Sequence, residues 1–445
     1  MHNSNYSTFL QASSLLCLVL PLVLTSAIVS PDIQHQMSSV IRISYKDLIQ
    51  QSPTAISCAR MAFCDRDSFG ALEIYDIPEW KTCREQVMKL GRQLALDQSE
   101  EGIRARDECR GDVRVGPGWM GSPGHETHSL QSGFYGNMKN NEQGNCKSKG
   151  NSKSNSNSND NDCQVQVWGA NRWPNLKQPE NDEAGFRASV TAATSLMHAT
   201  ALSTLDLAQK AAQEIMEERY ECKGVAGNNS NVLPPLREMA EQSNFLPTRL
   251  VYYDAKFSRE DAIMGSDSDR DDGTSDKYWL PWHLDFNLAT VFAPAAWIDE
   301  MNALNNNNLD ALTPLSLSSG TNNPEHESGL LLRNPKGTII PAAIGEDCML
   351  IQLGAHAQLA TGGILRSGPH AVKKSAQSAN FGRLSFGLFV YGPWNARMKP
   401  SSDLLGVIGG DEGILKDDFG CLMEKAYTGD TVLEGYKKFE QYMNG

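Results

Sequence analysis

The sequence predicts an α+β fold, with a double-stranded β-helix (jelly-roll) core, flanking N-terminal helices and a C-terminal helix. Two observations carry this prediction. From Thr248 onward, short apolar runs alternate with turn residues, which is typical of strands closed into a sandwich or barrel. Before Thr248, apolar residues recur at three- and four-residue spacing, which indicates helices. The strand-like runs are TRLVYYD, WHLDFNLATVF, GLLLRN, GTIIPAA, CMLIQLG, AHAQLAT and RLSFGLFVYG.

The composition is that of a folded, acidic protein. The 445 residues suffice for one large or two modest domains, and 40% hydrophobic residues against 21% charged ones permit a packed core. Lys and Arg number 40 and Asp and Glu 53, so the formal net charge is -13. Because no long basic block is present to neutralise phosphate, we expect no nucleic-acid partner.

The first segment, residues 1–30, predicts a signal peptide or a retained signal anchor. Its run LLCLVLPLVL is too short to span a membrane and is followed by small residues. No Lys or Arg precedes Arg42, so the usual positive flank is missing. We expect the secretory pathway or endoplasmic reticulum, with a cytoplasmic or plastid location as the alternative. Any membrane association would come from this segment alone.

An N-terminal region, residues 38–135, follows the leader. It contains a short strand-like run at 71–75 and a helical stretch from Glu79 to Leu96. Residues 136–163 are rich in Asn, Ser, Lys and Gly and almost lack apolar side chains. Such a segment cannot bury enough surface to offset its ordering entropy, so we expect a disordered insert.

The rest of the chain divides into helical support (residues 164–247), the jelly-roll domain (248–395) and a tail with a helix (396–445). A polar loop, 302–328, interrupts the jelly-roll domain. The support region contains one apolar stripe at helical spacing, which predicts a buried core helix. The stripe is Phe186, Val190, Ala193, Met197, Ala201, Leu205, Ala208, Ala212 and Ile215.

The candidate metal ligands are His283, Asp285 and His370. Side chains two apart on a strand face the same way, so His283 and Asp285 would share a face. His370, from a distant strand, would complete a triangle. Two imidazoles and one carboxylate form the arrangement with open positions that non-haem Fe(II) oxygenases use. By itself, the His-x-Asp pair also fits a solvated or internally satisfied histidine beside a surface aspartate.

A second pair, Arg383 and Ser385, opens the last apolar strand and also shares one face. A buried arginine requires an anion, and its planar fork suits a carboxylate bound through two hydrogen bonds. The serine hydroxyl could bind the same carboxylate. The alternative is an arginine paired with a structural Asp or Glu.

With these residues in place, the sequence resembles the 2-oxoglutarate/Fe(II)-dependent dioxygenases of the isopenicillin N synthase-like branch. The resemblance is strongest over 279–394. It includes GLLLRNPKGTIIP after the first ligand pair, the stretch 345–363 before His370, and FGALEIY in the N-terminal region. The last match implies that residues 38–135 are the N-terminal region of the dioxygenase. Departures are Ala355, where the family commonly has Asp, and Ala371, where it often has Arg.

The resemblance implies roles for the matching residues. His283, Asp285 and His370 would bind Fe(II), and Arg383 with Ser385 would hold the distal carboxylate of 2-oxoglutarate. A further residue, Tyr253, sits where the family often has a tyrosine that contacts this cosubstrate, although its usual Asn and Pro neighbours are replaced here.

The implied activity is oxidation of a small organic substrate with O2, by hydroxylation, desaturation or cyclisation, with release of succinate and CO2. Two alternatives stay open: an isopenicillin N synthase-like Fe(II) oxidase that does not use 2-oxoglutarate, and an inactive jelly-roll binding protein. We expect a monomer.

Overall fold

The computed structural model describes residues 40–111, 118–120, 127–134, 171–175, 185–223, 233–243, 246–254, 278–299, 328–374, 381–398 and 431–444. The predicted leader, the 136–163 insert and all but the last residue of the 302–328 loop lie outside these residues. Among the described helices, none is long and apolar enough to cross a membrane.

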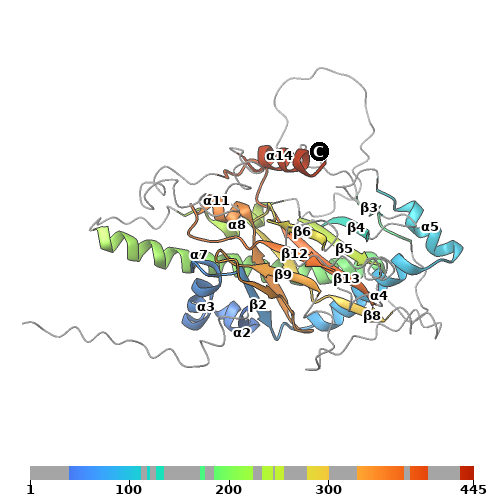
Figure 1. Cartoon of the computed structure of the whole chain (residues 1–445), viewed down its shortest axis with the longest axis horizontal. Coiled ribbons are helices and arrows are strands. Elements are labelled where there is room, and N and C mark those ends of the chain that lie inside the picture. The colour runs from blue at the N-terminus through green and yellow to red at the C-terminus, as the bar shows by residue number, and fades with distance from the viewer. Residues whose placement is uncertain are drawn as a thin grey trace, which may run out of the picture. The chain divides into compact units, whose positions relative to one another are not determined.

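The described elements follow one another as helices and strands in mixed order (Figure 1). The helices are α2 (Tyr45–Gln50), α3 (Pro53–Phe63), α4 (Trp80–Leu96), α5 (Glu100–Glu108), α7 (Phe186–Lys223), α8 (Leu236–Gln242), α11 (Ala355–Ala360) and α14 (Val432–Asn444). The strands are β1 (Ile41–Ser44), β2 (Ala71–Tyr75), β3 (Gly118–Met120), β4 (Thr127–Phe134), β5 (Leu246–Tyr253), β6 (Tyr278–His283), β7 (Ala289–Phe292), β8 (Ala296–Asp299), β9 (Gly329–Arg333), β10 (Ile339–Pro341), β11 (Met349–Leu353), β12 (His370–Lys373) and β13 (Phe381–Val390).

The strands form two sheets. The large sheet has the order β1-β2-β11-β7-β13-β5-β4-β3, with β8 paired to β13 beside β7, and the small sheet has the order β10-β9-β12-β6. All pairs are antiparallel except β1 with β2. From β5 to β13 the chain passes back and forth between the two sheets, which together form the predicted jelly-roll core. The α+β prediction is confirmed.

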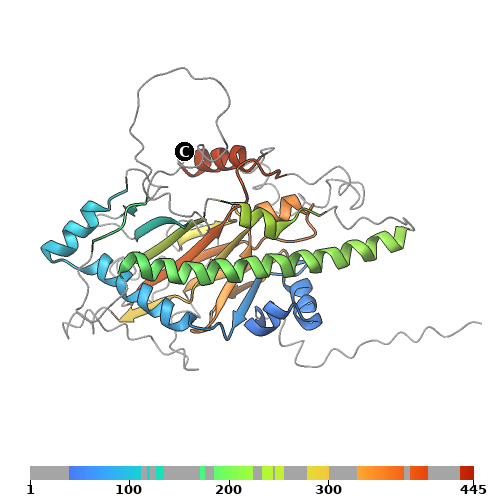
Figure 2. The ribbon, with the colours of Figure 1, turned by 180° about the vertical axis from the view of Figure 1, so that it is seen from behind.

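Side chains of β5 alternate between the two sides of the large sheet. Leu250 and Tyr252 pack in the cluster that includes apolar residues of the helices, whereas Val251 and Tyr253 pack in the cluster between the sheets. On the helical side, α7 crosses the large sheet and contacts β7, β11 and β13, with α3 and α4 packed against it (Figure 2). The inner side is therefore left to the space between the sheets.

Short helices begin at residues that cap them. Ser44 Oγ accepts a hydrogen bond from Asp47 N at 3.0 Å, and Ser52, just before Pro53, does the same for Ala55 N at 3.1 Å. Ser99 caps α5 in the same way. These bonds satisfy amide groups that lack a partner within the helix.

Most of the sequence-based elements are confirmed. The strand at 71–75, the helix up to Leu96, and the C-terminal helix are present, and the apolar stripe of α7 is buried except for the half-buried Ile215. Strands β1, β3, β4 and β8 were not predicted, whereas β12 is the strand that was expected to carry His370. The domain boundaries stay a prediction, although β1 to β4, which precede residue 248, join the large sheet.

Two expectations were wrong in detail. The run AHAQLAT, predicted as a strand, forms the helix α11, because residues with good helix propensity follow Gly354 and nearly all are buried. The run WHLDFNLATVF, predicted as one strand, is divided between β6 in the small sheet and β7 in the large one. In both cases an apolar run on its own did not specify where the chain turns.

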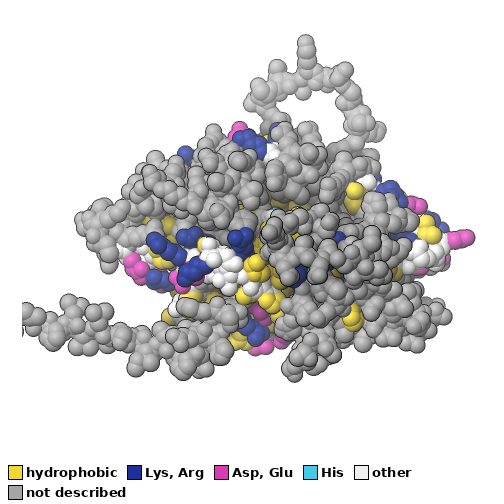
Figure 3. Space-filling model, viewed as in Figure 1, with side chains coloured by type: hydrophobic (Ala, Val, Ile, Leu, Met, Phe, Trp, Pro, Cys, Tyr) yellow, Lys and Arg dark blue, Asp and Glu magenta, His cyan; other side chains and the backbone are white. Residues whose placement is uncertain are grey.

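Charged side chains of both signs lie together on the described surface (Figure 3). Lys336 pairs with Asp67 at 2.5 Å, and Lys81 with Glu346 at 3.5 Å, with the side chains partly exposed. Exposed pairs of this kind contribute about 1 kcal/mol or less each, so the buried clusters dominate the stability of the fold.

Candidate metal centre

Two of the three predicted ligands lie next to each other on adjacent antiparallel strands of the small sheet. His283 is the last residue of β6, His370 is the first of β12, and the two are register partners. Their ring centroids lie 4.1 Å apart. The register shifts twice along this pair of strands, and such irregularities commonly redirect side chains near functional sites.

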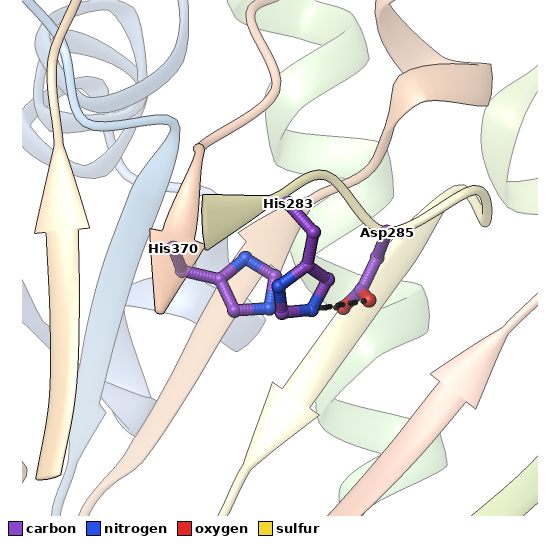
Figure 4. Close-up of side chains that lie close together, drawn as sticks. All are labelled: His283, Asp285 and His370. Carbon is purple, nitrogen blue, oxygen red and sulfur yellow. Dashed lines mark ion pairs between the residues drawn. The ribbon is translucent and has the colours of Figure 1, made fainter. Parts of the chain in front are cut away.

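Asp285 lies in the connection between β6 and β7, so the prediction that it shares a strand face with His283 is wrong. Its backbone carbonyl accepts a hydrogen bond from Ala355 N at 2.8 Å, which fixes this connection to the start of α11. The carboxylate still reaches both histidines (Figure 4). Its Oδ1 lies 3.6 Å from His283 Nε2, and its Oδ2 lies 3.6 Å from His370 Nε2.

Backbone carbonyls orient both imidazoles. His283 Nδ1 lies 2.8 Å from Pro281 O, and His370 Nδ1 lies 3.2 Å from Gly368 O. Because a carbonyl oxygen only accepts, each Nδ1 carries the hydrogen and each Nε2 presents its lone pair. The Nε2 atoms are the ones that meet at Asp285, as is usual for metal-binding histidines with an outer hydrogen bond.

Polar side chains also support the carboxylate. Thr290 Oγ1 donates to Asp285 Oδ2 at 2.5 Å, and Asn287 Nδ2 donates to Thr290 Oγ1 at 2.8 Å. Both Asn287 and Thr290 are buried. These two residues were not predicted as part of the site, although they are the polar members of the otherwise apolar run FNLATVF.

The electrostatics favour neutral imidazole at His283. The surrounding protein, and secondarily the neighbouring His370, disfavour the imidazolium and lower the pKa of His283 to about 4. At neutral pH its Nε2 lone pair is therefore free to bind a metal. The His370 side chain is only 3% exposed, whereas Asp285 and His283 are 14% and 27% exposed, so the cluster opens to solvent on one side.

The donor set fits an iron ion. One ligand atom from each of His283, Asp285 and His370 lies within 4.8 Å of the other two. Two imidazole nitrogens and one carboxylate oxygen in this arrangement are the facial donor set of non-haem Fe(II) sites. The three residues predicted from the sequence are thus brought together.

The predicted carboxylate anchor lies on the inner side of the large sheet. Arg383 is paired in register with Tyr253 on one side and with Trp297 on the other, and its guanidinium lies 5.5 Å and 5.7 Å from their ring centroids. Directly paired residues face the same side, so Arg383 points between the sheets with Tyr253. Ser385 is two residues along β13, on the same side and half-buried.

A stripe of inner-face positions connects the anchor to the metal ligands. Gly387 follows Ser385 on this side of β13 and pairs with Phe292, whose ring centroid is 5.4 Å from that of His370. Another missed residue is Trp279, which packs 4.9 Å from Tyr253. Its indole Nε1 is buried without a hydrogen-bond partner among the described residues. These aromatic neighbours depend on tertiary contacts, and no local motif indicated them.

Solved structures with the same architecture were found, whereas no protein-family model and no curated protein matches the sequence. One is a full-length Neurospora crassa protein in complex with alpha-KG (2-oxoglutarate), with a TM-score of 0.52, 12% identity and coverage of 91% of this chain and 96% of that one. Another is a putative 2OG-Fe(II) oxygenase family protein from Caulobacter crescentus, with a TM-score of 0.54, 11% identity and coverage of 91% and 99%.

At this level of identity, the likeness concerns the fold. The two sheets, the converging His–Asp–His cluster and the agreement over nearly the full length of both structures coincide with the resemblance read from the sequence. The chain therefore has the fold of the 2-oxoglutarate/Fe(II)-dependent dioxygenase superfamily.

Proposed function

We propose that the chain is a non-haem Fe(II)- and 2-oxoglutarate-dependent dioxygenase that oxidises a small organic substrate by hydroxylation, desaturation or cyclisation. The observation that carries the proposal is the convergence of His283, Asp285 and His370 on one point, with both Nε2 atoms presented to it. Bound iron, with 2-oxoglutarate and O2, would supply the oxidative chemistry, and succinate and CO2 would be released.

The protein's own part is to bind and to orient. The two imidazoles and the Asp285 carboxylate would hold the metal through three protein ligands, a set that leaves further positions for the reactants. Thr290 keeps one carboxylate oxygen in place through its hydrogen bond. This support limits rotation of the Asp285 carboxyl group, so the ligand geometry is largely formed before the metal binds.

Arg383 and Ser385 would bind the distal carboxylate of 2-oxoglutarate, and Tyr253 would contact the same cosubstrate. Arg383 is only 4% exposed, and its guanidinium lies near the rings of Tyr253 and Trp297, which restrict its movement. The planar fork of a guanidinium suits a carboxylate bound through two hydrogen bonds. This placement supports the 2-oxoglutarate-dependent activity over an oxidase without the cosubstrate.

The test combines metal binding with cosubstrate turnover. We expect the purified chain to bind one Fe(II) reversibly under anaerobic conditions, and to form succinate from 2-oxoglutarate in air. Asp285→Ala should abolish both, whereas Asp67→Ala, which removes an exposed carboxylate paired with Lys336, should change neither. Stoichiometric iron binding without succinate would indicate the oxidase, and absence of an iron site would indicate a binding protein.

The substrate is sought with the same assay. Candidate small molecules are scored by the increase that they cause in succinate formation. The panel includes pyrimidine bases, because the Neurospora crassa protein has also been crystallised with alpha-KG and thymine, in a structure with a TM-score of 0.52 to this chain. A compound that is consumed in proportion to succinate identifies the substrate class.

A further inference from the structure

The chain segment that carries Asp285 has a second, apolar attachment that the metal chemistry does not require. Leu284 and Phe286, the neighbours of Asp285, are only 2% and 1% exposed. Both belong to a separate apolar cluster formed with the C-terminal part of the chain. Asp285 thus faces the histidines while the residues on either side of it are anchored elsewhere. The other members of the cluster are Ala355, Tyr391, Trp394, Met398, Val432 and Tyr436.

Helix α14 approaches Phe286 unusually closely. A Cβ atom on Gly435 would lie 2.5 Å from Phe286 Cζ and 2.6 Å from Met398 Sδ. Real Cβ contacts are not this short, so any larger residue would force the buried Phe286 ring or the Met398 side chain to move. Glycine within a helix costs about 1 kcal/mol relative to alanine. The close approach to Phe286 gives a structural reason for glycine at this position.

Hydrogen bonds and ring contacts fix α14 in this place. Val432 N donates to Ala396 O and Leu433 N donates to Trp394 O, both at 3.0 Å. The Tyr436 ring makes edge contacts with Trp394 at 5.2 Å and with Tyr391 at 6.0 Å between centroids. The start of the helix is therefore attached to the segment after β13 and is not free to slide along Phe286.

We propose that α14 positions a metal ligand: the contact of Gly435 with Phe286 holds the β6–β7 connection so that the Asp285 carboxylate meets the two histidines. Gly435 and Phe286 are positioning residues, because neither touches the proposed metal. The inference rests on the proposed function, since it concerns metal affinity at the same site. It makes that affinity depend on a helix more than sixty residues beyond His370 in the sequence.

The experiment uses the full-length chain and Co(II), an oxygen-stable probe whose visible absorption reports ligand geometry. Gly435→Ala should raise the Co(II) dissociation constant about tenfold, the usual effect of losing support behind a metal ligand. It should also change the absorption spectrum of the bound ion. The matched control is Gly91→Ala in α4, where a Cβ would lie 2.6 Å from Leu250 Cδ2 on the helical side of the sheet. This control should lower stability without changing Co(II) affinity.

A size-complementary change completes the test. Phe286→Leu shortens the side chain that the new methyl group meets, so the double variant Phe286→Leu/Gly435→Ala should bind Co(II) more tightly than Gly435→Ala. If Gly435→Ala does not fold, the single variant Phe286→Leu is tested, and it should bind Co(II) more weakly than the wild type because the contact with α14 is lost. An unchanged Co(II) affinity of Phe286→Leu overturns the inference. Equal affinity losses in Gly435→Ala and Gly91→Ala also overturn it. A wild-type chain that binds no Co(II) overturns the proposed function itself, which is a distinct result.

Discussion

At the scale of single residues, the carboxylate of Asp285 is held by a relay of side chains. Asn287 donates to Thr290, and Thr290 donates to Asp285. The order matters because the Thr290 hydroxyl has one hydrogen, which goes to the carboxylate, while its lone pair accepts from the amide. The relay therefore gives one oxygen of Asp285 a fixed hydrogen-bond donor, the kind of outer support that orients a metal ligand.

The relay predicts that Thr290→Val lowers metal affinity. Valine keeps the shape of the side chain but cannot donate to Asp285, so the carboxylate loses one of its fixed contacts. We expect the Fe(II) dissociation constant to rise about tenfold, measured by anaerobic titration. Thr248→Val is the matched control, because this buried hydroxyl on β5 bonds Ser132 at 2.6 Å. Equal affinities of the two variants would contradict the relay.

Arg383 gives a prediction about the cosubstrate. Lysine keeps the charge but loses the planar fork, so Arg383→Lys should raise the KM for 2-oxoglutarate at least about tenfold, a loss of roughly 1.4 kcal/mol or more. Iron affinity should stay near the wild-type value because the anchor and the metal ligands are separate. The measurement is succinate formation over a range of 2-oxoglutarate concentrations. A KM equal to that of the wild type would show that the cosubstrate carboxylate binds elsewhere.

At the scale of elements, the long helix α7 is a support for the large sheet. It crosses the side of that sheet opposite the site and contacts β7, β11 and β13, of which β7 follows the Asp285 connection. Its buried face is a continuous stripe of mainly alanine, methionine and leucine side chains. Packing of this kind fixes the sheet and, through it, the relative position of the two ligand-bearing segments.

If α7 supports the sheet in this way, shortening a side chain on its buried face should destabilise the protein more than shortening one on its exposed face. Met197 is fully buried, so Met197→Ala should lower the free energy of unfolding by about 2–5 kcal/mol, as cavity-forming substitutions do. Ser195 is exposed, and Ser195→Ala should change the free energy of unfolding by less than about 0.5 kcal/mol. Denaturant titration measures both. Similar losses would mean that the stripe is not the packed face.

Elements with a strong local signal could be predicted from the sequence, whereas turns and tertiary contacts could not. The α7 stripe persists over many turns, so its period is unambiguous. The ligands His283, Asp285 and His370 were found through their chemistry, even though Asp285 lies off the strand that was meant to carry it. The strand prediction for the run 355–361 was wrong, because a short apolar segment fits a strand and a helix equally well.

At the scale of the whole molecule, the C-terminal part of the chain connects to the core through a buried histidine. His356 of α11 is fully buried, and its Nε2 lies 3.3 Å from Arg397 O, which places a hydrogen on Nε2 because a carbonyl oxygen only accepts. A Cβ on Gly392 would lie 2.8 Å from its Cε1, so the ring is tightly enclosed. Burial lowers the pKa of His356 to about 4.

That burial predicts a loss of stability in weak acid. The unfolded chain binds a proton at His356 with a pKa near 6.5 and the folded chain only near 4, so the stability is fully present above about pH 6.5 and falls as the pH approaches 4. Between pH 8 and pH 5 the loss from this residue is about 2 kcal/mol. His356→Gln should show a correspondingly smaller change in unfolding free energy over this range. Parallel pH profiles of the two proteins would contradict the assignment.

Metal binding should also stabilise the molecule, because the three ligands come from the small sheet and from the segment that connects it to the large sheet. His283 and His370 belong to the small sheet, and Asp285 lies on the passage from it to β7 of the large sheet. An ion that binds only when these segments are together favours the folded state, by about 2.7 kcal/mol at one hundred times its dissociation constant.

We therefore expect Mn(II), a redox-stable substitute for Fe(II), to raise the melting temperature by several degrees and a chelator to reverse the change. His370→Ala should abolish the increase, because an alanine leaves only two ligands. Asp67→Asn, which alters an exposed ion pair, should keep it. The comparison is made within each variant, with and without metal, so that differences in intrinsic stability cancel. An unchanged metal-induced shift in His370→Ala would place the ion outside the His–Asp–His cluster, and the coupling between the two sheets would then have to come from packing alone.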